Sequence, residues 1–216
     1  MTVRYRLIFA CATLAALSAC KSSGDIVVDE GVGITAVRGA CPAVGIPDYT
    51  GDVTLFTSPD RRDAGAIDVA AAMTNVRSQC NETGPKVYAL ASFDVLARRS
   101  DVRGARVVTL PYFVTVLRGG TAVVSKRVGS VTLNFADGQE RAQARAQGAA
   151  YIDRAEATLP EDIRRRITRK RRAGDNDAAT DPLSEPEVKA AIARASFEML
   201  VGFQLDEKQL AYNATR

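Results

Sequence analysis

Apolar residues between positions 53 and 80 repeat first with the period of a strand and then with that of a helix. The short apolar run at residues 53–57, after the turn residues Thr50 and Gly51, predicts a strand. Residues 66–80 carry apolar side chains at spacings of 4, 3 and 4, which predicts a helix with one apolar face, made by Val69, Met73, Val76 and Cys80.

Three strands are predicted to follow. Residues 87–98 alternate between apolar and polar side chains, as a half-buried strand does. Residues 106–118 are apolar on both faces, which favours a central strand, although Pro111 removes one backbone donor and predicts a bulge or a partial edge. Gly119 and Gly120 suit a two-residue hairpin turn, after which residues 121–135 return with an expected irregularity near 127–129. The order β-α-β-β-β predicts an α+β fold, an antiparallel-rich sheet with helices on one face.

The remainder of the chain is predicted to be helical. Asp137 and Glu140 resemble a capping box that opens an alanine-rich helix over 137–157, and a second helix is expected over 158–174. A third helix begins near residue 184, with Val188, Ile192, Ala195 and Met199 on one face, and Asp206 and Gln209 cap a fourth, with Leu205 and Leu210 as a hydrophobic staple. The sequence thus predicts a sheet domain over 41–136 and a helical region over 137–216 that packs on it.

The N-terminus has the pattern of a signal for export. Arg4 and Arg6 precede an apolar run over 7–17 that is too short to span a bilayer. The run ends in Leu17-Ser18-Ala19-Cys20, which resembles the lipobox of bacterial lipoproteins; an ordinary cleaved signal peptide is the alternative.

The resemblance implies a signal peptide over 1–19, acylation of Cys20 with diacylglycerol and palmitate, and a flexible tether over 20–40. Lys21 stands where aspartate marks retention in the inner membrane of enteric bacteria. By this analogy the protein is expected on the periplasmic face of the outer membrane rather than in the inner membrane. The rest of the chain is not assigned to a family.

Composition narrows the possible functions. The chain of 216 residues is 46% hydrophobic and 25% charged, which is typical of a globular protein. Its net charge of +4 falls toward neutrality once Arg4 and Arg6 leave with the signal, so we expect no nucleic-acid partner. Histidine is absent, which removes a histidine-based catalytic triad and the commonest zinc ligand. We therefore expect no enzyme, no cofactor and no metal.

Two cysteines, Cys41 and Cys80, remain after the signal and the lipid have used the other two. In an oxidising compartment such a pair predicts one structural disulfide. A redox-active pair is the alternative, although neither cysteine belongs to a Cys-x-x-Cys motif.

Seven cations crowd into residues 164–172. One interpretation is a solvated helix end, where cations suit the helix dipole. The other is a contact for an anion of the cell envelope, such as lipid phosphate, lipopolysaccharide or an acidic partner. The cations are Arg164, Arg165, Arg166, Arg169, Lys170, Arg171 and Arg172.

Two functions are compatible with these features. The first is a non-enzymatic envelope lipoprotein that acts as an accessory or scaffold and docks on another envelope protein. The second is a binding module that faces the periplasm and takes a lipid, a glycan or another anionic ligand. A cavity of several hundred cubic ångströms beside the sheet would favour the second, and an exposed apolar patch over a closed core would favour the first.

Overall fold

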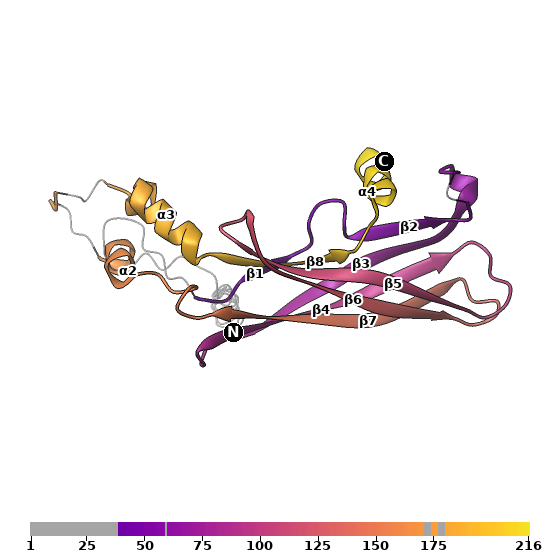
Figure 1. Cartoon of the computed structure of the whole chain (residues 1–216), viewed down its shortest axis with the longest axis horizontal. Helices are drawn as coiled ribbons and strands as arrows, with labels where there is room; N and C mark the ends of the chain where they lie inside the picture. The colour runs from indigo at the N-terminus through magenta and orange to yellow at the C-terminus, as the bar shows by residue number, and fades with distance from the viewer. Residues whose placement is uncertain (1–38, 59, 171–173, 177–179) are drawn as a thin grey trace, which may run out of the picture. The chain divides into compact units, whose positions relative to one another are not determined.

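A computed structural model describes residues 39–58, 60–170, 174–176 and 180–216 (Figure 1). The signal peptide, Cys20 and nearly all of the tether predicted from the sequence lie outside these residues. Contacts divide the chain into two units, Ile34–Arg169 with Asp181–Arg216, and Met1–Gly33 with Lys170–Thr180. The first unit holds all the strands and helices described below.

This unit contains two four-stranded sheets. The first has the order β1-β8-β5-β6 and is antiparallel except for β1, which runs parallel to β8. Its strands are β1 (Ala43–Gly45), β8 (Phe197–Phe203), β5 (Arg106–Arg118) and β6 (Ala122–Phe135).

The second sheet has the order β2-β3-β4-β7 and is antiparallel throughout. Its strands are β2 (Asp52–Phe56), β3 (Ile67–Asn81), β4 (Lys86–Arg99) and β7 (Arg141–Asp153). The inner faces of the two sheets share one hydrophobic core, in which the rings of Phe93 and Tyr112 meet edge to face at 5.1 Å between centroids.

Within the described residues, the helices lie in the C-terminal part, apart from the 3-10 turn η1 (Ala64–Ala66), and complete an α+β fold with a C-terminal helix, as the sequence predicts. They are α2 (Glu161–Thr168), the 3-10 turn η2 (Pro182–Ser184), α3 (Pro186–Ala195) and α4 (Glu207–Thr215). The capping box of α4 is confirmed, because Asp206 and Gln209 exchange side-chain and backbone hydrogen bonds.

The strands predicted from alternation are confirmed. Every second residue of β4 from Val87 to Ala97 is buried. Gly119 and Gly120 both have positive φ in the turn between β5 and β6, as a two-residue hairpin requires. The irregularity of β6 lies beside Val124, where the register shifts, and not at 127–129.

Pro111 lies in the central strand β5, in register with Ser130 of β6, and no bulge occurs at this position. Its carbonyl accepts a hydrogen bond from the amide of Gln204, so its backbone polar groups face the β8 side. Because β8 ends at Phe203, the missing amide hydrogen of Pro111 falls where the neighbouring strand has already stopped.

The helix predicted at 66–80 is wrong, because these residues form strand β3. Val69 and Met73 are buried on one face, and a spacing of 4 fits a strand as well as a helix. A bulge then inserts an extra residue between Thr74 and Arg77, with Asn75 at a φ of 52°, and returns Val76 to the core. A bulged strand therefore reproduces the spacing of 4, 3 and 4.

The helix predicted at 137–157 is also wrong, because β7 occupies most of this segment. Arginine and glutamine alternate with alanine and glycine along β7, and the small residues face the core. A Cβ atom at Gly148 would lie 2.2 Å from Cγ2 of Val114, so the close approach of β7 to β5 requires glycine there. Asp137 does not cap a helix; its carboxylate accepts a hydrogen bond from the amide of Gly104.

The third predicted helix ends earlier than its apolar pattern suggests. It stops at Ala195, and Met199, expected on its apolar face, is fully buried in β8 instead. Strands β7 and β8 thus belong to the sheets although they lie within 137–216, so the sheet region does not end at residue 136.

Candidate functional site

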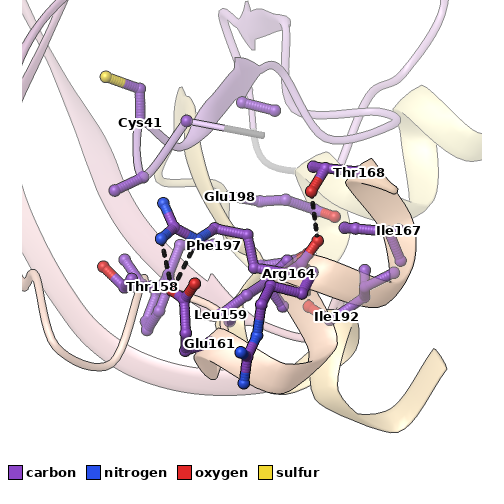
Figure 2. A pocket seen from close by; sticks show the side chains of 17 residues that line it. Cys41, Thr158, Leu159, Glu161, Arg164, Ile167, Thr168, Ile192, Phe197 and Glu198 are labelled. Atoms are coloured by element: carbon purple, nitrogen blue, oxygen red, sulfur yellow. Dashed lines mark hydrogen bonds and ion pairs between the residues drawn. The ribbon is translucent and has the colours of Figure 1, made fainter. Parts of the chain in front are cut away.

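A pocket of about 620 Å³ lies where α2 and α3 meet the end of the first sheet (Figure 2). One wall comes from α2, with Leu159 just before it, and another from Ile192 of α3. The opposite walls are the start of β8, at Phe197 and Glu198, and the segment from Gly39 to Ala43. The pocket is within the size range of ligand sites for small molecules.

The pocket exists because the apolar residues form two separate clusters. The large cluster fills the space between the sheets, and a small one joins α2 to α3 through Ile163, Ile167, Val188 and Ala191. Leu159 and Ile192 are only partly buried against the small cluster and also line the pocket. The contact between α2 and α3 is therefore made by the apolar face of α2.

Two arginines of the basic run line the pocket. Arg164 donates its Nε hydrogen to Oε2 of Glu161 at 2.9 Å, and an Nη2 hydrogen bond reaches the same oxygen. The guanidinium is thereby held in one orientation between α2 and the Cys41 side of the pocket (Figure 2). Arg165 also lines the pocket and has no ion-pair partner among the described residues.

None of the other described cations of the run lines the pocket. Arg166 contacts Glu185 at 3.4 Å and Glu187 at 2.9 Å, which joins α2 to α3. Its hydrogen bond to Glu187 raises the pKa of the Arg166 guanidinium. Arg169 and Lys170 follow α2, and each takes part in a polar or ionic contact. Arg171 and Arg172 lie outside the described residues.

Glu198 is the pocket residue that the sequence did not reveal. It lies on β8, paired in register with Ala43 of β1 and Leu117 of β5. It has no ion-pair partner within the described part of the chain. Because the sequence places its neighbour Met199 on the apolar face of a helix, no signal in the sequence puts this carboxylate on a strand opposite α2.

The hydroxyl groups of the pocket are engaged with the backbone. Thr158 donates to the carbonyl of Arg154 at 2.6 Å, and Thr168 donates to that of Arg164 at 2.8 Å. Their oxygens retain acceptor capacity, whereas the free donors on this wall belong to the guanidinium groups.

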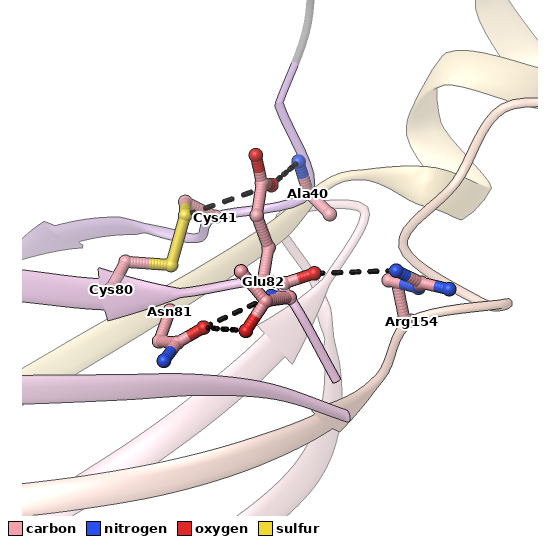
Figure 3. Close-up of a disulfide and its surroundings, with 7 residues drawn as sticks. Ala40, Cys41, Cys80, Asn81, Glu82 and Arg154 are labelled. Atoms are coloured by element: carbon pink, nitrogen blue, oxygen red, sulfur yellow. Dashed lines mark hydrogen bonds between the residues drawn. A yellow bond between two sulfur atoms is a disulfide. The ribbon is translucent and has the colours of Figure 1, made fainter. Parts of the chain in front are cut away.

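The predicted disulfide is confirmed and fixes one wall of the pocket (Figure 3). Cys41 and Cys80 are bonded with their Cα atoms 6.0 Å apart, which ties the segment before β1 to the end of β3. Beside it, the amide of Ala40 donates to Oε2 of Glu82 at 2.9 Å, and Arg154 donates to the carbonyl of Glu82 at 3.4 Å. Cys80 is exposed rather than buried, because it stands on a strand that extends past the core.

The described residues contain no group of three or more side chains arranged to hold a metal ion. None of the helices in the described ranges is long and apolar enough to cross a membrane.

A second surface feature is a patch of exposed valines on the first sheet. Strand β6 forms the edge of this sheet, and its residues 122–128 are all exposed. The valine patch consists of Val123, Val124 and Val128 on β6.

No family model, no curated protein and no solved structure matches this chain.

Proposed function

We propose that this protein is a non-enzymatic lipoprotein of the cell envelope whose pocket binds an amphiphilic ligand, most simply a phospholipid. The observation that carries the proposal is the pocket of about 620 Å³ that sets Arg164 and Arg165 beside Leu159 and Ile192. Guanidinium groups bind phosphate, and apolar side chains accept the adjoining hydrocarbon. The lipobox at residues 17–20 supports the same compartment, because a protein anchored through Cys20 meets phospholipid at the membrane surface.

The chain contains no tryptophan, so a single introduced indole reports on the pocket alone. In the full chain purified in detergent, Leu159→Trp places that indole in the pocket wall, and Leu210→Trp on α4 is the matched control. A short-chain phospholipid below its micelle concentration should shift the emission of the first variant and leave the second unchanged. Equal responses, or no response at Leu159→Trp, would refute binding in the pocket.

The membrane anchor is tested separately. Cys20→Ala should abolish the incorporation of palmitate and release the protein from the membrane fraction, because acyl chains are the proposed means of attachment. A Cys20→Ala protein that still sediments with outer membranes, beside an unlabelled wild type, would contradict the anchor.

The valine patch supports a second candidate function, an accessory that docks on another envelope protein. An edge strand with exposed apolar residues is open to pairing with another chain. A photoreactive amino acid at Val128 should then give one discrete protein adduct in cells, whereas the same residue at Gln147 on β7 should not. Identical labelling at both positions would count against a docking strand.

A further inference from the structure

The charges on the pocket wall divide into an internal pair and two unpaired groups. Glu161 binds Arg164 through a single carboxylate oxygen, so this pair is satisfied within α2. The Nη1 group of Arg164 has no acceptor among the described residues and remains able to donate. Arg165 and Glu198 line the pocket without an ion-pair partner in the described chain.

These two unpaired groups come from different elements. Arg165 belongs to α2. Glu198 lies on β8, in the wall formed by the sheet (Figure 2). A ligand that carried only negative charge would satisfy Arg165 and approach the carboxylate of Glu198 without compensation. A ligand that carried only positive charge would satisfy Glu198 and approach the guanidinium of Arg165 without compensation. A ligand with one anionic and one cationic group pairs with Arg165 and Glu198 at the same time.

The size and the apolar residues of the pocket restrict this ligand further. A volume of about 620 Å³ is much larger than a free amino acid needs, so a zwitterionic head must be accompanied by additional bulk. Leu159, Ile192 and Phe197 provide apolar surface for that bulk beside the charged groups.

We infer that the pocket is selective for a zwitterionic phospholipid whose head carries a primary ammonium group, as in phosphatidylethanolamine. The phosphate is bound by Arg165 and the free Nη1 of Arg164, the ammonium by Glu198, and the start of the acyl chains by Leu159 and Ile192. Glu161 is a positioning residue that orients Arg164. This inference rests on the proposed function, because it names the class of lipid that the pocket takes.

Calorimetric titration of the full chain with two short-chain lipids tests the inference. Dihexanoyl phosphatidylethanolamine and dihexanoyl phosphatidylglycerol share the phosphate and the chains, and differ in the ammonium group. The ethanolamine lipid should bind about tenfold more tightly, since a charged hydrogen bond of this kind is worth about 1.5 kcal/mol or more. Glu198→Gln should remove this preference while binding persists, whereas Arg165→Gln should weaken both lipids.

A matched control and the contrary outcomes keep the two proposals separate. Glu207→Gln removes an exposed carboxylate on α4, away from the pocket, and should leave the preference unchanged. If the wild type binds neither lipid, the proposed function itself fails. If it binds both equally, or prefers the glycerol lipid, or if Glu198→Gln keeps the preference, phospholipid binding stands and the selectivity for an ammonium head is refuted.

Discussion

Cys41 and Cys80 covalently join the segment that forms one wall of the pocket to the end of β3, across a separation of 39 residues. Only three residues of β1 pair with β8 beyond this point, so the bond and the hydrogen bond from Ala40 to Glu82 restrain residues 39–41. The stability of the sandwich and the shape of the pocket are therefore linked through one bond.

Replacement of both cysteines by serine should lower the free energy of unfolding by about 2–4 kcal/mol, because a closed loop of this length restricts the unfolded chain. Urea denaturation of the wild type and the double variant measures this difference. The double variant should also bind lipid more weakly, since the wall at Gly39 to Cys41 loses its attachment. Unchanged stability and unchanged binding would show that the wall is held by other contacts.

Arg99 should be among the most sensitive positions in the protein. Its side chain is 1% exposed, and its guanidinium donates to the carbonyls of Val102, Gly104, Ala136 and Gln139, each at 2.8 Å. Arg99→Met would leave buried carbonyl groups without donors, at a cost of about 3 kcal/mol or more.

The adjacent Arg98 offers a matched control. It is exposed and pairs with Glu140 on the surface, so Arg98→Met should cost less than about 1 kcal/mol. Thermal or urea denaturation of the two variants compares them directly. Similar losses for both would mean that the buried network of Arg99 is not the restraint between the β4–β5 and β6–β7 turns.

Gly148→Ala should destabilise the sandwich by about 1–3 kcal/mol, because the new methyl group overlaps Val114, a buried and β-branched residue. Combination with Val114→Ala makes room for the methyl group. The double variant should therefore lose less stability than the sum of the single variants. Gly84→Ala, whose added Cβ would lie 3.7 Å from its nearest neighbour, is the control. If the stability losses of the two single variants simply add in the double variant, the methyl group at position 148 does not overlap Val114.

Tyr112 should ionise at higher pH than a tyrosine ordinarily does. Burial raises the pKa of its phenol, whose hydroxyl donates to the carbonyl of Gln147 at 2.7 Å. The pKa of Tyr112 in the folded protein lies above its value of about 10 in the unfolded chain. The neutral phenol therefore contributes its full share to the free energy of unfolding below about pH 10, and this contribution is lost as the pH rises through the folded-state pKa. Tyrosinate absorbance followed against pH should contain a late component that Tyr112→Phe removes; a titration unchanged by the substitution would contradict this.

The sequence allowed some elements to be predicted because their pattern was purely local. The alternation in β4, the paired glycines at 119–120 and the capping box of Asp206 with Gln209 each determine a structure within a few residues. The errors at β3 and β7 have a different origin. A bulge at Asn75 changed the phase of one strand, and the other carries alanine and glycine because it packs against Val114 of a distant strand. Neither the bulge nor the packing between distant strands can be recognised from a short stretch of sequence.

The pocket was predicted only in part for the same reason. The basic run was evident, and the two cysteines were paired correctly. The position of Glu198 opposite α2 depends on β8 pairing with β5 across 80 or so residues of chain, which no local pattern encodes. The partners of Arg164 and Arg166 likewise became evident only when α2 and α3 were placed together.

Photolabelling with a short-chain phosphatidylethanolamine that carries a diazirine in its acyl chain tests the central claim most directly. The full chain is labelled in detergent, digested, and the attachment sites are identified by mass spectrometry. The pocket predicts adducts confined to residues 158–168 and 192–198, suppressed by excess unlabelled lipid and reduced by Arg165→Gln. Adducts concentrated on the valine patch at residues 122–128, or spread without suppression over both sheets, would contradict a lipid site between α2 and β8.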